Sequence, residues 1–145
     1  AYRKLFEYAV SIYPIGLSEA RIAYWYANDV ATNLKATTTQ QALTEIDIVK
    51  QSIVKADANI DRNIKVNSVE KSFHPAIYAL EGMALQKLAS VGVGSTKDAE
   101  DRFQKANALL SETPSAKSSL IRLAKTDLAF KAYLIKNGWH EADFK

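Results

Sequence analysis

The sequence predicts an all-α fold of six or seven antiparallel helices, stacked as helical hairpins. Apolar residues recur at steps of three and four along most of the chain, which is the spacing of one helix face. All three prolines, and every glycine except Gly82, fall at or near the ends of these stretches. No stretch shows the sustained apolar–polar alternation of a half-buried strand.

Two helices are expected in the first part of the chain. Residues 2–13 are rich in aromatic side chains at helical spacing, and Pro14 and Gly16 end this helix. The next helix begins near Ser18, which can cap it. Its apolar seam suits packing against another helix and consists of Leu17, Ala20, Tyr24, Ala27, Ala31 and Leu34.

A third helix is expected over residues 39–66, with Thr38 and Gln41 as its capping box. In the alternative interpretation, residues 57–59 break this stretch into two helices. We favour one helix because the helical spacing continues and neither glycine nor proline interrupts it. Its apolar positions are Leu43, Ile46, Val49, Ile53, Ala56, Ile60 and Ile64.

The stretch from His74 to Phe144 organises the rest of the chain. Pro75 suits the first turn of a helix, with His74 or Ser72 as the cap. Glycine in mid-helix costs about 1 kcal/mol relative to alanine, so we expect a packing reason for Gly82. Small side chains at helical spacing let another helix approach closely, and this helix carries Ala76, Ala79 and Gly82.

The glycine-rich segment after residue 90 ends this helix, and Ser95 or Thr96 can cap the next one. A further helix is expected to run unbroken over residues 115–136, with Asn137 and Gly138 as its C-terminal cap. The helix that starts after Ser95 or Thr96 carries Ala99, Phe103 and Ala106 on one face.

These residues resemble a tetratricopeptide repeat, a unit of two antiparallel helices. The family has a small residue in the middle of its first helix, as at Gly82, and proline often follows its second helix, as at Pro114. The second helix of the family carries an Ala-x3-Phe-x2-Ala pattern, matched by Ala99, Phe103 and Ala106. Residues 137–142 are similar to the turn and second-helix start of a further repeat. The resemblance implies a right-handed array whose first helices line a concave surface.

Length and composition limit the classes of protein. We expect one domain over residues 1–145, with N-terminal helices in 1–73 and repeat-like hairpins in 74–145. Cysteine is absent, which excludes disulfides and thiolate catalysis. The net charge is +3, but acidic and basic residues alternate, so we expect no direct nucleic-acid contact.

No apolar run is long enough to span a membrane, and no signal peptide is visible. The composition does not identify a compartment. Because the sequence starts at Ala1 and enters a helix almost at once, we expect it to be a processed form or a fragment of a longer chain.

No residue pattern points to an active site, a metal or a cofactor. His74 is expected in a cap or loop and His140 on the surface, and the only carboxylates near either in a metal-ligand pattern are Glu141 and Asp143, which adjoin His140. The carboxylate pairs Asp57/Asp61 and Asp98/Asp101 are expected on solvated helix surfaces. The glycine-rich residues 92–97 lack the spacing of a phosphate loop and follow no strand. We therefore do not expect an enzyme.

The leading hypothesis is a non-catalytic protein-interaction module that binds a peptide or partner domain on a concave helical surface. The family resemblance implies that residues 75–89 and 115–136 line this surface. A basic groove there favours an acidic peptide or a carboxylate terminus. The candidate contact residues are Tyr78, Arg122, Lys125 and Lys131.

Two alternatives remain from the sequence. One is a sensory or effector domain of a larger transcription regulator. The other uses the three successive rings of Tyr24, Trp25 and Tyr26, which helical geometry spreads around the helix. These rings form either a wide buried interface with the first helix or an aromatic groove for a small ligand. A truncated repeat array also exposes an apolar end, which favours a homodimer.

Overall fold

The computed structural model describes residues 16–34, 39–63 and 71–145, and in these ranges every regular element is helical. Six α-helices are described: α2 (Leu17–Asp29), α3 (Gln40–Asn63), α5 (His74–Ser90), α6 (Thr96–Ala108), α7 (Lys117–Thr126) and α8 (Leu128–Lys136). A π-helical turn follows α2 at Val30–Leu34, and 3-10 turns lie at Leu109–Ser111, Pro114–Ala116 and Glu141–Phe144. The all-α prediction is confirmed for these residues, whereas the helix expected over residues 2–13 lies outside them.

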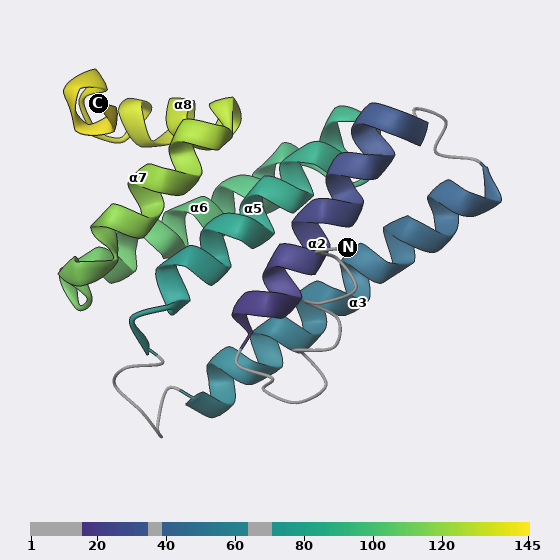
Figure 1. The fold of residues 1–145 in the computed structure, drawn as a ribbon, viewed down its shortest axis with the longest axis horizontal. Coiled ribbons are helices and arrows are strands. Elements are labelled where there is room, and N and C mark those ends of the chain that lie inside the picture. The colour runs from purple at the N-terminus through teal and green to yellow at the C-terminus, as the bar shows by residue number, and fades with distance from the viewer. Residues whose placement is uncertain (1–15, 35–38, 64–70) are drawn as a thin grey trace.

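Helix α5 is the centre of the arrangement. From α2 to α7 the described helices alternate in direction, and α2, α5 and α7 lie on the side facing the viewer in Figure 1. Helix α5 packs against α2, α3, α6, α7 and α8. Eleven of its 17 residues are therefore buried, as expected for a helix that is covered on most sides.

Helices α5 and α6 approach closely at Gly82. A Cβ atom at this position would lie 2.5 Å from two ring carbons of Phe103 and 3.0 Å from the Ala99 carbonyl oxygen. The Phe103 ring cannot easily move away, because it is buried and its centroid lies 4.9 Å from that of Phe130 and 5.4 Å from that of Tyr133. The packing reason expected for the mid-helix glycine is confirmed.

The buried apolar side chains form two adjoining clusters. The larger one joins α5 to α6, α7 and α8 and is centred on Ile77, Met83, Phe103, Leu120, Phe130 and Leu134. The smaller one lies between α2, α3 and the second half of α5 and includes Ala23, Ala27, Val30, Val49, Ile53 and Leu88. In the expected α3 seam the residues from Ile46 to Ile60 are buried, whereas Leu43 is half exposed and Ala42 is buried in its place. Ile64 lies outside the described residues.

The start of α2 is joined to α3 through the buried carboxylate of Glu19. Gly16, not Ser18, precedes the first turn of α2, and its N–H donates to the Glu19 carboxylate over 3.1 Å. Asn59 Nδ2 donates to the other oxygen of the same buried carboxylate over 2.7 Å. The alternative of two helices broken at 57–59 is therefore wrong, because this segment stays helical and ties α3 to α2.

Other helix ends agree only in part with the expected caps. Helix α5 begins at the buried His74, and its N-cap is Phe73, whose side chain makes no capping hydrogen bond, instead of the expected His74 or Ser72. At α3 the Thr39 hydroxyl accepts a hydrogen bond from the Ala42 N–H over 3.1 Å, while Thr38 lies outside the described residues. Ser95 precedes α6 as expected, but its side chain makes no capping hydrogen bond.

Helix α8 ends at the predicted place. Gly138 has a φ of +105°, which glycine adopts without strain. The Trp139 N–H then donates to the Leu134 carbonyl over 3.0 Å, and the Gly138 N–H donates to the Ile135 carbonyl over 3.3 Å. This is the hydrogen-bond pattern of a Schellman motif.

The single helix expected over residues 115–136 is wrong, because the chain turns at Asp127. This residue is extended, with φ −139° and ψ 109°. One carboxylate oxygen of Asp127 accepts the Phe130 N–H over 3.0 Å, and the other accepts the Tyr24 hydroxyl over 3.2 Å. The turn directs α8 across the end of α7 and buries Phe130 and Leu134 (Figure 1). Apolar spacing continues through the turn, so periodicity does not reveal it.

We predict that Asp127→Ala lowers the free energy of unfolding by about 2–3 kcal/mol. The substitution removes the cap of α8, worth about 1 kcal/mol, and leaves the half-buried Tyr24 hydroxyl without its acceptor, at a cost of about 1–2 kcal/mol. Urea denaturation followed by circular dichroism measures the change. Tyr24→Phe removes only one of the two bonds and should cost clearly less. An Asp127→Ala variant as stable as the wild type would contradict the assignment.

Candidate functional site

A groove lies between α2, α5 and α7, the three helices that face the viewer in Figure 1. It consists of two hollows that share Arg21, Leu80 and Leu123. The larger hollow has a volume of about 300 Å³ and is also lined by Leu17, Phe73, Ala76, Ser119 and Arg122. The smaller hollow has a volume of about 160 Å³ and is also lined by Tyr24, Trp25, Met83 and Thr126.

The groove combines an apolar floor with positive charge at its rim. Among the described residues, Arg21 and Arg122 are the charged side chains that line it, and no carboxylate does. Both arginines are exposed. A guanidinium group binds a carboxylate through two parallel hydrogen bonds. The groove therefore favours a ligand that carries a carboxylate beside an apolar group.

The three rings of the predicted aromatic site do not line one common hollow. Tyr24 and Trp25 line the smaller hollow, whereas Tyr26 packs against the cluster between α2 and α3. Burial, followed by the charge of Asp127 and the hydrogen bond to it, raises the pKa of Tyr24 to about 12. The Tyr24 hydroxyl thus stays protonated and directed at Asp127, and its ring forms part of the hollow.

The four predicted partner-binding residues have different surroundings. Arg122 lines the larger hollow, and Lys125 is exposed on the same helix but lines neither hollow. Lys131 lies on α8 and forms an ion pair with Glu141 at 2.7 Å. Tyr78 is half-buried in a charged cluster with residues of α3 and α6. The sequence did not single out Arg21, Leu80 or Leu123, because only the packing of α2 beside α5 and α7 brings them together.

The charged cluster around Tyr78 contains a fully buried acid. Glu81 has no exposed surface, and the Arg102 guanidinium donates to its Oε1 atom. The same guanidinium pairs with the Asp57 carboxylate at 3.3 Å, and Lys105 Nζ lies 5.6 Å from the Tyr78 ring centroid. The expectation that Asp57 is only a solvated surface residue is therefore wrong. In the sequence, the signal for this cluster is the carboxylate of Glu81 among the apolar residues of α5.

Burial raises the pKa of Glu81 to about 9, and the hydrogen bond and negative charge of Asp57 add to the rise against the opposing effect of Arg102. At neutral pH Glu81 therefore keeps its proton and donates it to Asp57, while Arg102 balances the Asp57 charge. A buried acid with a raised pKa is a common catalytic feature. Here the carboxyl group has no exposed surface and lines none of the hollows described, so it ties α3, α5 and α6 together.

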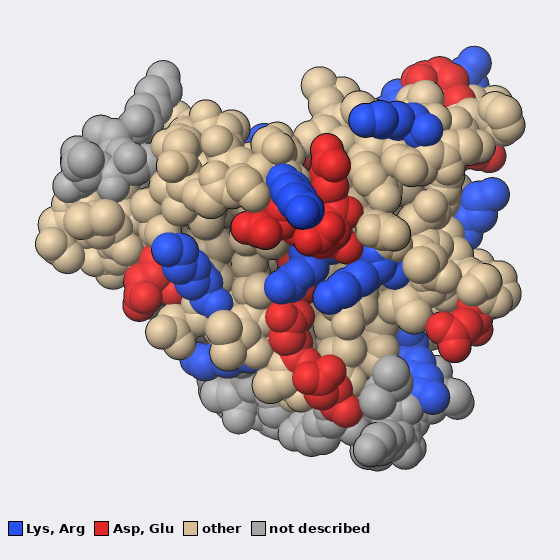
Figure 2. Space-filling view, turned by 180° about the vertical axis from the view of Figure 1, so that it is seen from behind, with Lys and Arg blue, Asp and Glu red and all other residues tan. Residues whose placement is uncertain are grey.

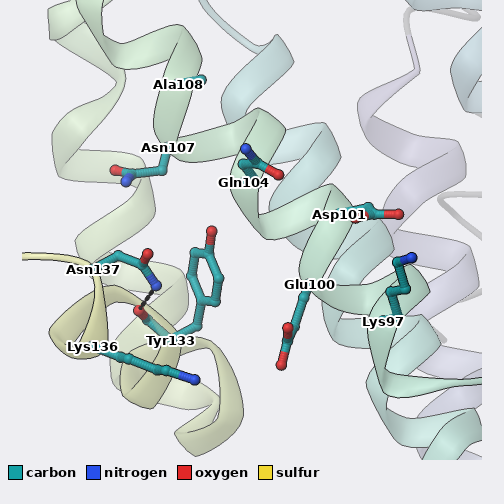
Figure 3. A pocket seen from close by; sticks show the side chains of 9 residues that line it. All are labelled: Lys97, Glu100, Asp101, Gln104, Asn107, Ala108, Tyr133, Lys136 and Asn137. Carbon is teal, nitrogen blue, oxygen red and sulfur yellow. Dashed lines mark hydrogen bonds between the residues drawn. The ribbon is translucent and has the colours of Figure 1, made fainter.

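A third hollow, of about 500 Å³ and lined mostly by polar and charged residues, lies between α6 and the end of α8 (Figure 3). Burial and the nearby Glu100 raise the pKa of Tyr133, whose ring lies between the two helices. Lys97 and Lys136 line the hollow together with Glu100 and Asp101. Because both signs of charge are present, the hollow favours no particular ligand charge.

The opposite face of the molecule carries charges of both signs. Acidic and basic side chains are interleaved along its middle, without a separate basic field (Figure 2). Within the described ranges, no three His, Asp or Glu side chains gather to hold a metal ion. No described helix has the length and apolar character needed to cross a bilayer.

Comparisons of the chain with protein-family models, with curated proteins and with solved structures find no match. The tetratricopeptide resemblance therefore stays a prediction. The groove between α2, α5 and α7 is the surface whose chemistry selects most clearly among ligands, because it joins apolar walls to one sign of charge.

The Glu81 cluster predicts a pH-dependent stability. The folded state holds the Glu81 proton up to about pH 9, whereas the unfolded chain releases it near pH 4.5, so the folded state binds more protons between these values. The free energy of unfolding should therefore fall as the pH rises through this window. Glu81→Gln removes the titrating group and keeps a donor toward Asp57. The free energy of unfolding of the variant, relative to that of the wild type, should therefore rise between pH 5 and pH 9.

Urea midpoints at pH 5, 7 and 9 test this prediction, with the exposed Glu112→Gln as a matched control. The control should follow the wild type at every pH. A constant difference between the Glu81→Gln variant and the wild type would show that Glu81 does not titrate in this window.

Proposed function

We propose that the protein is a non-catalytic interaction module that binds an acidic peptide segment in the groove between α2, α5 and α7. The observation that carries the proposal is the pairing of an apolar floor with Arg21 and Arg122 and with no carboxylate among the described lining residues. A peptide with alternating apolar and acidic side chains satisfies both parts of this surface.

The charge arrangement supports an acidic partner rather than a purely apolar one. Arg122 forms no ion pair with any described residue, so a partner carboxylate can pair with it without displacing a described carboxylate. Leu80 and Leu123 lie beneath both hollows and supply continuous apolar area. Charged rims raise the association rate, and the apolar centre slows dissociation.

The repeat-like arrangement is part of the same proposal. Helix α2 packs against α3, and α5 against α6, as in two successive helical hairpins, whereas α8 crosses the end of α7 (Figure 1). Helices α2 and α5 are the first helices of these pairs, α7 is the next helix after the second pair, and α5 contacts both α2 and α7. In a tetratricopeptide-like array the first helices line the peptide-binding surface, in agreement with the position of the groove.

A second candidate function is small-ligand binding at the Tyr24–Tyr26 region. It is favoured by the smaller hollow, whose aromatic and aliphatic walls include Tyr24, Trp25 and Met83. A small apolar ligand would fill this hollow without contacting Arg122, which lines only the larger one. The dependence of binding on Arg122 therefore separates the two functions.

We predict that a random 12-residue peptide library, selected on the protein at low salt, yields peptides with Asp or Glu next to apolar residues. Arg122→Glu should weaken these peptides at least tenfold, because a hydrogen bond to a charged group is worth about 1.5 kcal/mol. Fluorescence anisotropy with labelled peptides measures the change.

Lys125→Glu is the matched control, since it reverses the same charge on the same helix outside the groove. It should change the affinity less than threefold. Selected peptides without acidic residues, or equal losses in the two variants, would contradict the proposed function.

A further inference from the structure

The smaller hollow has the size of one apolar side chain. Its volume is about 160 Å³. An engineered protein cavity of about 150 Å³ with apolar walls stays dry and binds benzene. A leucine, methionine or phenylalanine side chain therefore fits the hollow, whereas an alanine methyl group leaves most of it empty.

The walls of the hollow favour an apolar occupant. Leu80 and Met83 are almost completely buried and form its floor, with Trp25 and Leu123 beside them. The Tyr24 hydroxyl already donates its proton to Asp127, so this donor is not available to an occupant. The Met83 thioether is adaptable and contacts aromatic rings favourably.

The position of Arg21 links this hollow to the charged part of the groove. Its side chain lines both hollows, together with Leu80 and Leu123. A carboxylate that reaches Arg21 would therefore lie directly beside the apolar side chain in the smaller hollow. Arg122 lines only the larger hollow and lies farther along the groove.

We infer that the smaller hollow is the anchor subsite of the peptide groove and takes one leucine-sized or phenylalanine-sized side chain next to an acidic residue. This inference rests on the proposed function and adds the feature that sets its sequence specificity. The recognised segment is then an apolar anchor with an adjacent carboxylate on Arg21 and a further acidic group toward Arg122.

The test is a double-mutant cycle that combines a substitution of the peptide's anchor residue with a substitution in the hollow. In an Arg122-dependent peptide, replacing the anchor by alanine should weaken binding to the wild-type protein about tenfold to hundredfold, since burying such a side chain is worth about 1.5–3 kcal/mol. Thr126→Phe fills the hollow from an exposed position, and circular dichroism checks its fold. On this variant the anchor and alanine peptides should differ less than threefold.

Ser119→Phe is the matched control, because Ser119 lines only the larger hollow. It should keep the full anchor preference. Arg122-dependent peptides that tolerate alanine at every apolar position, or an anchor preference that survives in Thr126→Phe, would overturn the anchor subsite alone. If no Arg122-dependent peptide is selected, the proposed function and the anchor subsite are both wrong.

Discussion

The close approach of α5 and α6 at Gly82 is the constraint on which the rest of the structure depends. The Phe103 ring occupies the space that a side chain at Gly82 would need. From this position it packs against Phe130 and Tyr133 of α8, so the same contact that joins α5 to α6 also supports α8. Leu80 and Met83 of α5 are then left to line the groove with α2 and α7.

Three buried carboxyl groups supplement this apolar packing, and each joins different helices. Glu19 connects α2 to Asn59 of α3, Glu81 connects α5 to α6 through Arg102, and Asp127 connects the α7–α8 turn to Tyr24 of α2. Buried polar pairs contribute little net stability, but each demands its partner and disfavours other packings. The Asp127 bond also holds one wall of the smaller hollow, so it links the turn before α8 to the proposed binding surface.

The sequence predicted the helical elements better than their assembly. Local signals identified α5, α6, the long α3 and the packing role of Gly82, because spacing, turn residues and helix cost act within one helix. The turn at Asp127 was not predicted, because apolar spacing continues through it and one of its two partners, Tyr24, is 103 residues away. For the same reason Arg122 was recognised as a candidate without Arg21, which reaches the groove only through the packing of α2. The raised pKa of Glu81 was not predicted, because it depends on neighbours from α3 and α6.

A double-mutant cycle between Gly82 and Phe103 tests the central constraint most directly. In the wild-type background, Gly82→Ala should lower the free energy of unfolding by about 1–3 kcal/mol, because the added methyl group overlaps the Phe103 ring. In a Phe103→Leu background the same substitution should cost clearly less, because the ring is gone and alanine has the better helix propensity, while the contact with the Ala99 carbonyl at 3.0 Å remains. An equal cost of Gly82→Ala in both backgrounds would contradict the claim that this contact sets the packing of α5 and α6.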